Sequence, residues 1–357
     1  MTQEKGNEFW KKLAKPIFAL APMHDVTDAA FRNIIAKYGK PDVFYTEFVS
    51  TEALMSEKGH DKVIHYLKFS DVEHPIVAQV FGCKPEKFYE TTKLVASQGF
   101  DGIDINMGCP EKNAVKGGSC AGLFHTPEIA QQLILACKQG AKDYAKEHGT
   151  EVIDVSIKIR IGDTKVDWEN WLTALLKAEP AAIAIHLRTR KEMSKVPAHW
   201  EVMPDIIKFI NDHTTPENRP VILGNGDVPN ITEAKNLVRE TGCDGVMLGR
   251  AIFGNPWLFT NAHSEEPFTP PTLEERLKVL LEHTKLYEKY FDGTKPFDIM
   301  KRHFKAYVAG FDGAAELRAQ MFETKSASDL ELVITKFLAK SNRTIGILPK
   351  IKKFLRI

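Results

Sequence analysis

The chain has 357 residues, of which 43% are hydrophobic and 27% are charged, a composition typical of a globular protein with room for one large and one small domain. This composition excludes a disordered chain, a collagen-like fibre and a disulfide-rich miniprotein. The 48 basic and 47 acidic residues leave a net charge of +1, so a polyanionic partner would have to meet a local basic patch.

No segment approaches the roughly 18 consecutive apolar residues that a membrane-spanning helix requires. The charged N-terminus also lacks the apolar core of a signal peptide. The five cysteines are odd in number and no pair has Cys-x-x-Cys spacing, which argues against a disulfide framework and a zinc site. We therefore expect a cytoplasmic protein that holds no metal. The oligomeric state is open, with a monomer as the default expectation.

Short β-branched apolar runs recur along the chain, with helical patterns between most of them. The runs predict eight strands, at residues 17–21, 43–46, 76–80, 102–106, 155–159, 182–186, 221–224 and 246–248. The helical patterns cover residues 28–38, 85–98, 127–148 and 231–240. This alternation predicts an α/β fold, a (β/α)₈ TIM barrel. An open doubly wound sheet is disfavoured because the sequence contains neither Gly-x-Gly-x-x-Gly nor a Walker A motif.

A cluster of prolines near residues 265–271 predicts a linker, because proline resists both helix and central strand. Beyond it, helices are predicted at residues 273–290, 297–310, 314–322 and 328–340, which indicates a small helical bundle. The predicted domains are therefore a barrel at residues 1–265, a helical domain at 266–340 and a basic C-terminal tail at 341–357.

In a (β/α)₈ barrel, functional side chains lie at the C-terminal ends of the strands. Gly224-Asn225-Gly226 follows the seventh predicted strand and Gly249-Arg250 follows the eighth, where such barrels bind phosphate. Glycine lets backbone N–H groups approach phosphate oxygens, and arginine adds a forked cation. These two loops predict a phosphate site, with ordinary turn glycines as the alternative.

Basic side chains also close the fifth and sixth predicted strands. Lys158 and Arg160 alternate onto the same face, and a lysine on a buried strand is costly without an anionic partner. We interpret Lys158 as a cation beside an electron-rich ring, with an ion pair to Asp104 as the alternative. His186 followed by Arg188 favours a phosphate or nucleotide site over a core histidine beside a solvated loop.

The densest group of chemically active residues is Asp104-Ile105-Asn106-Met107-Gly108-Cys109-Pro110. It runs from a buried strand into a turn that carries Cys109, and a glycine-rich basic loop follows. No His–Asp pair is apparent that would make this thiol a nucleophile. A thiol with the ordinary pKa of about 8.5 is mostly protonated at pH 7, so Cys109 is predicted to be a proton donor.

Taken in order, these motifs closely resemble those of the dihydrouridine synthases, flavin enzymes that reduce uridine in tRNA. The resemblance covers roughly residues 17–337. The motifs that carry it are Ala21-Pro22-Met23, Gln79-Val80-Phe81-Gly82, the Asp104 to Pro110 stretch, Lys116-Gly117-Gly118, Lys158-Ile159-Arg160, His186-Leu187-Arg188-Thr189-Arg190, Asn225-Gly226-Asp227 and Gly249-Arg250. One departure is His24, where the family often has a smaller or apolar residue.

The resemblance implies an FMN-binding barrel, a tRNA-binding helical domain and NADPH as reductant. The residues implied to bind FMN are Pro22, Met23, His24, Gln79, Lys158, His186, Asn225, Gly226, Asp227, Gly249 and Arg250. Cys109 matches the catalytic cysteine. The candidates for substrate binding are Asn106, Arg160 and Arg188 at the uracil, Lys112 and Lys116 at the tRNA backbone, and Lys301, Arg302, Lys305 and Arg318 in the helical domain.

The implied reaction reduces the C5=C6 bond of uracil. Hydride passes from flavin N5 to C6, and Cys109 gives a proton to C5 from the opposite face, while Lys158 stabilises negative charge on the flavin ring. One alternative is an FMN barrel oxidoreductase that acts on a free pyrimidine-like molecule. Another is an RNA-binding protein without catalysis. The uridine positions that are reduced cannot be read from the sequence.

Overall fold

The structure is a computed structural model that describes residues 8–266 and 268–351, with side chains up to residue 340. Its contacts divide the chain into two compact units, one ending at Ala251 and the other beginning at Ile252. The proline cluster that predicts the boundary lies later in the sequence, near residue 265. Each unit has buried apolar residues of its own.

The described part of the first unit contains nine parallel strands. They are β1 (Ile17–Leu20), β2 (Phe44–Tyr45), β3 (Val49–Ser50), β4 (Ile76–Phe81), β5 (Gly102–Asn106), β6 (Asp154–Arg160), β7 (Ala182–His186), β8 (Val221–Asn225) and β9 (Gly245–Leu248). Their order is β1-β9-β8-β7-β6-β5-β4-β2, with β3 paired to β4. A bridge between Ala19 and Val43 brings β1 beside the start of β2 and nearly closes the ring. The predicted (β/α)₈ TIM barrel is confirmed.

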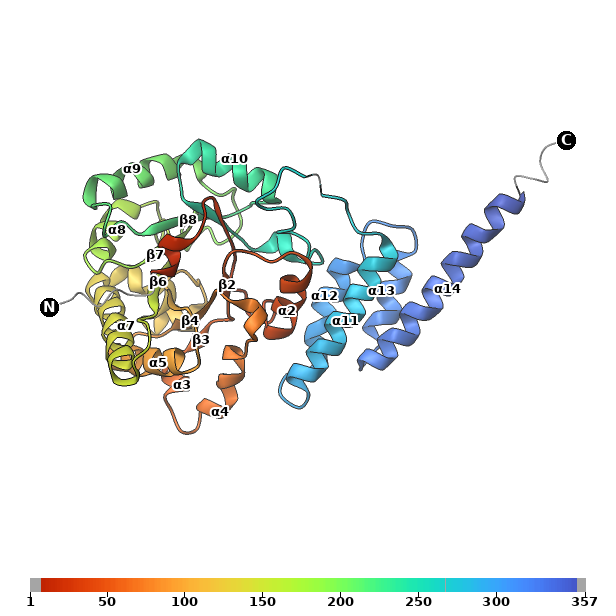
Figure 1. Ribbon diagram of the computed structural model, residues 1–357, viewed down its shortest axis with the longest axis horizontal. Coiled ribbons are helices and arrows are strands. Elements are labelled where there is room, and N and C mark those ends of the chain that lie inside the picture. Colours follow the sequence, from red (N-terminus) through yellow and green to blue (C-terminus); the bar gives the residue numbers. More distant parts are fainter. Residues whose placement is uncertain (1–7, 267, 352–357) are drawn as a thin grey trace. The chain divides into compact units, whose positions relative to one another are not determined.

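Helices connect these strands and surround them in Figure 1. They are α1 (Phe9–Lys12), α2 (Ala29–Tyr38), α3 (Thr51–Leu54), α4 (His60–Val63), α5 (Pro85–Ser97), α6 (Lys112–Lys116), α7 (Pro127–His148), α8 (Trp168–Leu176), α9 (Met203–His213) and α10 (Ile231–Thr241). Short 3-10 helices are η1 (Ile64–Leu67), η2 (Asp71–Glu73), η3 (Cys120–His125), η4 (Trp200–Val202) and η5 (Arg250–Ile252). Helices α8 and α9 complete the alternation at two places where the sequence analysis predicted none.

The barrel interior is filled by apolar side chains that alternate along the strands. Ala19, Leu223 and Met247 are fully buried in this cluster, and Trp10 of α1 joins them. The Trp10 backbone N–H donates to the carboxylate of Asp154, the first residue of β6, over 3.4 Å. Because α1 packs at the N-terminal ends of the strands, the site belongs at their C-terminal ends.

The second unit is helical. Its elements are α11 (Leu273–Phe291), η6 (Phe297–Ile299), α12 (Met300–Tyr307), α13 (Ala314–Phe322) and α14 (Ala327–Ile351), which Figure 1 draws in cyan to blue. Thr272 and Glu275 form a capping box at the start of α11. The predicted bundle is confirmed, but the tail is not separate from it at residues 341–351, because α14 continues through them. Residues 352–357 of the predicted tail lie outside the described residues. Within the described chain, no helix combines the length and apolar character needed to cross a membrane.

Candidate functional site

A cavity of about 310 Å³ opens at the C-terminal ends of β1, β6, β7, β8 and β9. Eleven residues predicted for the site line it: Pro22, Met23, Lys158, Arg160, His186, Arg188, Asn225, Gly226, Asp227, Gly249 and Arg250. Ala21, Pro110, Met193, Ser194, Val228 and Met247 complete the lining. The other six residues predicted in the barrel do not line it: His24, Gln79, Asn106, Cys109, Lys112 and Lys116. The barrel therefore gathers most of the predicted residues in one place.

Lys158 reaches this cavity from within β6. Its Nζ donates to Asn225 Oδ1 over 3.4 Å. Burial and the positive charge of Arg160 lower the pKa of Lys158 to about 8, so the amine is still mainly protonated at pH 7. The alternative predicted from the sequence was a pairing with Asp104. The Asp104 carboxylate accepts its hydrogen bonds from Gln79 and Ser156 rather than from Lys158, although its charge acts to raise the pKa of Lys158.

His186 closes β7 and is a neutral member of the site. Its Nδ1 donates to Asn225 Oδ1 over 2.9 Å, and the Asn225 amide is fixed by a bond from Nδ2 to the Met247 carbonyl. The remaining ring nitrogen, Nε2, then accepts from Arg188 Nη1 at 3.3 Å. Burial, reinforced by the cations around it, lowers the pKa of His186 to about 2. The imidazole therefore carries no charge at physiological pH.

An acidic side chain joins two arginines at the edge of the cavity. Asp227 accepts hydrogen bonds from the guanidinium groups of Arg188 and Arg250. Arg188 is almost completely buried, whereas the Arg250 side chain is 63% exposed. The adjacent Gly226 has φ +136°, and a Cβ there would lie 2.7 Å from the Cβ of Ala198. The positive φ and the neighbouring Ala198 therefore require glycine at this position, and the exposed Arg250 leaves a cation at the edge of the cavity.

A buried hydrogen-bond chain lies beside the cavity. Ser156 Oγ donates to Asp104 Oδ1 over 2.7 Å, and Gln79 Nε2 donates to Asp104 Oδ2 over 2.8 Å. Gln79 Oε1 in turn accepts from Asn106 Nδ2 over 3.0 Å. Burial raises the pKa of Asp104 to about 6. Each amide in the chain is therefore held in one orientation by its neighbours.

This chain of hydrogen bonds ends at the turn that carries Cys109. Asn106 Oδ1 accepts from the backbone N–H groups of Gly108 and Cys109 over 3.1 and 3.0 Å. Arg160 Nε donates to the Gly108 carbonyl over 2.7 Å, and its Nη1 donates to the Thr189 carbonyl over 3.0 Å. Both Asn106 and Arg160 therefore hold this turn in place. Neither interaction was predicted from the sequence.

The Cys109 thiol has a lowered pKa. A hydrogen bond with the Cys120 thiol is the largest cause, and the Glu111 backbone N–H and the Arg160 charge add to it against the opposing effect of burial. Together they bring the pKa of Cys109 to about 6. The expectation of an ordinary thiol was wrong, because it could not include a second cysteine folded against the first.

His24 lies next to two acidic side chains and two aromatic rings. Its ring nitrogens are 3.7 Å from a Glu47 oxygen and 3.8 Å from an Asp25 oxygen. The Tyr66 ring lies 5.2 Å from the imidazole, and burial followed by the charges of Glu47 and Asp25 raises the pKa of Tyr66 to about 12. One ligand atom from each of His24, Asp25 and Glu47 lies within 4.8 Å of the others, a spacing that a metal ion could use.

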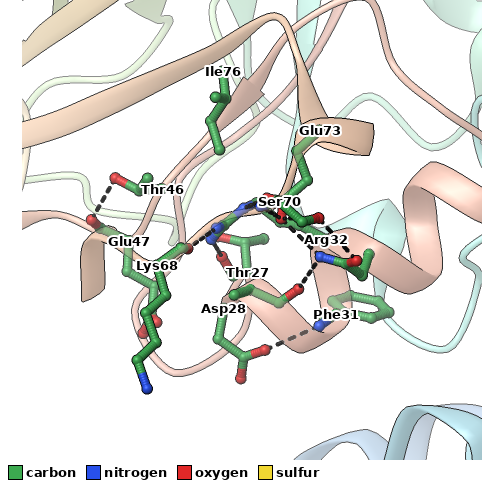
Figure 2. Close-up of polar contacts among 12 residues, drawn as sticks. Thr27, Asp28, Phe31, Arg32, Thr46, Glu47, Lys68, Ser70, Glu73 and Ile76 are labelled. Carbon is green, nitrogen blue, oxygen red and sulfur yellow. Dashed lines mark hydrogen bonds and ion pairs between the residues drawn. The ribbon is translucent and has the colours of Figure 1, made fainter. Parts of the chain in front are cut away.

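Figure 2 shows a buried arginine, Arg32, that contacts Lys68 and Glu73. Arg32, on α2, is fully buried and donates from Nε to Glu73 Oε2 over 2.5 Å. Its other nitrogens donate to the carbonyls of Thr27 and Lys68, each over 2.6 Å. One side chain thus ties residues 68–73 to the start of α2.

Lys112 and Lys116 lie on α6, which follows the Cys109 turn, and both side chains are exposed. In the helical unit, Lys305 is exposed, Lys301 Nζ lies 2.6 Å from Asp298 Oδ1, and Arg318 Nη1 donates to the Val308 carbonyl over 2.7 Å. Arg318 therefore supports its own unit.

Comparison with known proteins assigns the chain to a family. The profile described as "Dihydrouridine synthase (Dus)" matches residues 19–342. The "Probable tRNA-dihydrouridine synthase" of Staphylococcus aureus strain Mu50 is 41% identical over 341 residues, which cover 95% of this chain and 98% of the relative. The chain belongs to the dihydrouridine synthase family. The "Probable tRNA-dihydrouridine synthase 2" of Bacillus subtilis strain 168 is also 41% identical, over 93% of this chain and 97% of the relative.

The barrel of this dihydrouridine synthase is also similar to a solved structure of very different sequence. Histamine dehydrogenase from Rhizobium sp. 4-9 superposes with a TM-score of 0.51 at 10% identity, covering 75% of this chain and 48% of that chain. At this identity the likeness concerns the fold alone.

Sequence reasoning missed several site residues of this dihydrouridine synthase. Met193 and Ser194 reach the cavity from the loop after β7, and Cys120 reaches Cys109 from the glycine-rich loop. Cys120 directly follows Gly117-Gly118-Ser119, and its place in the glycine-rich loop was a signal from which it could have been included among the site residues.

Proposed function

We propose that this dihydrouridine synthase reduces uridines in tRNA to dihydrouridine, with FMN in the barrel and NADPH as the reductant. Family membership and relatives named tRNA-dihydrouridine synthase support the reaction and the substrate. The observation that carries the assignment of the site is the cavity itself, which sets a protonated lysine and three arginines beside a cysteine of low pKa. A volume of about 310 Å³ lies within the range of small-ligand sites.

The residues at the rim fit the phosphate of FMN. Gly226 and Gly249 line the cavity with backbone that carries no side chain, and Arg250 is exposed enough to turn from Asp227 toward an anion. Arg188 stays buried between Asp227 and the Val196 carbonyl, so we assign it to holding Asp227 and His186 rather than to direct phosphate binding.

The residues deeper in the cavity fit the flavin ring. Lys158 offers a positive charge at pH 7, and neutral His186, whose two ring nitrogens are engaged by Asn225 and Arg188, adds no second charge beside it. Bound FMN supplies the hydride that uracil C6 receives. Asn225 holds both Lys158 and His186 through one oxygen, so the two side chains are oriented before the ligand arrives.

Cys109 is the proposed acid for uracil C5. With a pKa of about 6 the thiol is mainly ionised at pH 7, so the protonated minority would carry the transfer and the rate should fall as pH rises above 6. Its S–H bond breaks as the C5–H bond forms, and the electron pair stays on sulfur. Asn106 and Arg160 keep the turn in place while this happens, through the Cys109 N–H and the Gly108 carbonyl. We assign Gln79 to orienting Asn106, because its amide lies between Asn106 and Asp104.

A uridine within folded tRNA must leave its stack to reach the cavity, which costs a few kcal/mol. Backbone phosphate contacts offset this cost. Lys112 and Lys116 are proposed to supply such contacts beside the cavity, and exposed Lys305 on α12 is the proposed contact in the helical unit. We expect tRNA affinity to fall steeply with added salt, since each neutralised phosphate releases counterions.

An anaerobic absorption experiment tests the proposal. We expect the purified protein to show flavin bands, NADPH to bleach them, and tRNA lacking dihydrouridine to restore them. Cys109→Ala should keep the bleaching step and lose most of the restoration. Restoration of the flavin bands by a free pyrimidine such as orotate, in the absence of RNA, would instead establish an oxidoreductase that acts on small molecules. Absence of flavin even after FMN is added would overturn the proposed reaction.

A further inference from the structure

A row of polar side chains crosses three neighbouring strands of the barrel. Gln79 on β4 is paired with Asp104 on β5, and Asp104 is paired with Ser156 on β6. Asn106 follows two residues after Asp104, so it lies on the same face of β5 and nearer the C-terminal end. We propose that Asp104 is a positioning residue for the proton transfer, because its carboxylate sets the direction of the side-chain amides that hold the Cys109 turn. This inference deepens the proposed function and rests on it for the role of Cys109 as proton donor.

The row is buried, so each of its hydrogen bonds constrains the next one. Gln79, Asp104 and Ser156 are almost completely buried, and Asn106 is 6% exposed. Ser156 Oγ donates to one Asp104 oxygen over 2.7 Å, and Gln79 Nε2 donates to the other over 2.8 Å. Both oxygens of the carboxylate are therefore engaged. Water cannot replace a partner that is lost at this depth, and an unpartnered buried group is costly.

The two ends of the hydrogen-bond chain require the same direction. The Asp104 pKa of about 6 leaves its carboxylate mainly ionised at pH 7, and an ionised carboxylate can only accept. Gln79 must therefore turn Nε2 toward Asp104, which leaves Gln79 Oε1 to accept from Asn106 Nδ2 over 3.0 Å. At the outer end, the backbone N–H groups of Gly108 and Cys109 can only donate, and Asn106 Oδ1 accepts from both.

Reversal of the amides would break the contact with the turn. A Gln79 side chain turned round would set its oxygen against the Asp104 carboxylate, with no proton between the two acceptors. Its Nε2 would then take up Asn106 Oδ1, and Asn106 Nδ2 would face the backbone N–H donors of the turn. An asparagine in place of Asp104 can donate as well as accept, so it permits both directions. Asp104 thus excludes the reversed arrangement although it does not itself line the cavity.

The direction of the chain matters for the reaction because the turn carries the proposed acid. The Cys109 thiol must stay close to uracil C5 and aligned with it while its S–H bond breaks, and small displacements of a reacting group are costly in rate. Loss of the Asp104 carboxylate should therefore slow the chemical step. It should leave tRNA affinity nearly unchanged, because that affinity depends mainly on contacts with backbone phosphates.

Amide hydrogen exchange of the full-length protein, as purified, tests the positioning without any substrate. Exchange at Gly108 and Cys109 is followed by peptide mass spectrometry. We expect Asp104→Asn to speed this exchange about 5- to 10-fold, the difference between a hydrogen bond to a charged group and one to a neutral group. Gln79→Met breaks the link between Asp104 and Asn106 and should also speed exchange, which provides a second variant if the first does not fold. Unchanged exchange in either folded variant would overturn the proposal.

A paired substitution tests the direction itself. Asn106→Asp alone leaves Gln79 between two groups that only accept, so it should also speed exchange at the turn. Combined with Asp104→Asn, the same change moves the carboxylate to the outer end, and every hydrogen bond can form with the Gln79 amide turned round. Exchange in the double variant should therefore return toward that of the unmodified protein. Faster exchange in the double variant than in both single variants would overturn the proposal.

A matched control separates this role from a general loss of stability. Thr92→Val removes another buried hydrogen bond, from Thr92 Oγ1 to the Phe88 carbonyl over 2.8 Å within α5, and keeps the shape of the side chain. It should leave exchange at the Cys109 turn unchanged. An increase equal to that of Asp104→Asn would show that any lost buried hydrogen bond loosens the turn, and would overturn the proposal.

Flavin reoxidation by tRNA provides the second readout. With Asp104→Asn, the rate at saturating tRNA should fall about 10-fold, while the tRNA concentration that gives half this rate should change by less than about twofold. If exchange at the turn changes as expected but tRNA never reoxidises the flavin of the unmodified protein, the proposed function fails and the positioning of the turn stands. If reoxidation proceeds at equal rates in the two proteins, the inference about Asp104 fails alone.

Discussion

His186 and Asn225 are directly paired residues on neighbouring strands, and the His186 Nδ1–H donates to Asn225 Oδ1 across the 2.9 Å between them. The same oxygen accepts from Lys158 over 3.4 Å. One amide therefore sets the tautomer of a neutral imidazole and the direction of an ammonium group. This arrangement separates the two roles: Lys158 carries the charge and His186 carries none.

We predict that His186 does not titrate between pH 5 and pH 8. Burial and neighbouring cations lower its pKa to about 2, so the ring stays neutral throughout this range. Nuclear magnetic resonance of the labelled imidazole can follow it. His199 is the internal control, because hydrogen bonds to Glu192 and Glu201 raise its pKa and it should gain a proton as pH falls through neutrality. A His186 signal that moves with pH in parallel with His199 would contradict the prediction.

We predict that Arg250→Ala weakens FMN binding by about 10- to 100-fold, the effect of one hydrogen bond to a charged group. The variant should leave the fold intact, because the Arg250 side chain is largely exposed. Quenching of FMN fluorescence on binding measures the affinity. Arg239→Ala, on the outside of α10, is the matched control and should bind FMN as the unmodified protein does.

We predict that Arg32→Met lowers the free energy of unfolding by about 3–5 kcal/mol, because it leaves the Glu73 carboxylate buried without its cation. Urea unfolding followed by tryptophan fluorescence measures this change. Replacing Lys208, whose ion pair with Asp212 is exposed on α9, should leave the unfolding midpoint nearly unchanged. Equal effects of the two substitutions would show that the Arg32 contacts in Figure 2 do not stabilise the segment.

We predict that Asp104→Asn flattens the acid dependence of stability. Burial raises the pKa of Asp104 to about 6 in the folded chain, above its ordinary value of about 3.8. The folded state therefore binds more protons than the unfolded state between these values, and this residue makes stability fall as pH rises from about 4 to 6. Melting temperatures of both proteins across this range test it, and parallel curves would contradict the prediction.

The sequence predicted the barrel well because its strands are β-branched runs buried on both faces. Strand β3 was missed because it has only two residues, Val49 and Ser50, too few to form a pattern. The shared face of Lys158 and Arg160 was also predicted, since it follows from strand alternation. Both side chains do line the cavity.

The contacts that the sequence could not predict are those made by loops that fold back onto the strand ends. The Arg160 guanidinium donates to carbonyls at Gly108, Thr189 and Met193, and backbone carbonyls have no sequence signature. Likewise, the thiol pair requires the glycine-rich loop to bring Cys120 back against the Cys109 turn. A pattern of residue types shows that such a loop can turn, but not which side chain it meets.

The Asp227 carboxylate held between Arg188 and Arg250 makes the rim selective as well as cationic. To bind here, an inorganic phosphate ion must displace the Asp227 carboxylate from an arginine, and it gains only the contacts at the edge of the cavity. In the proposed site, a flavin phosphate would bind together with a ring placed beside Lys158 and His186, so its binding free energy would come from two groups of contacts. We therefore expect inorganic phosphate to compete only weakly with FMN for the proposed site.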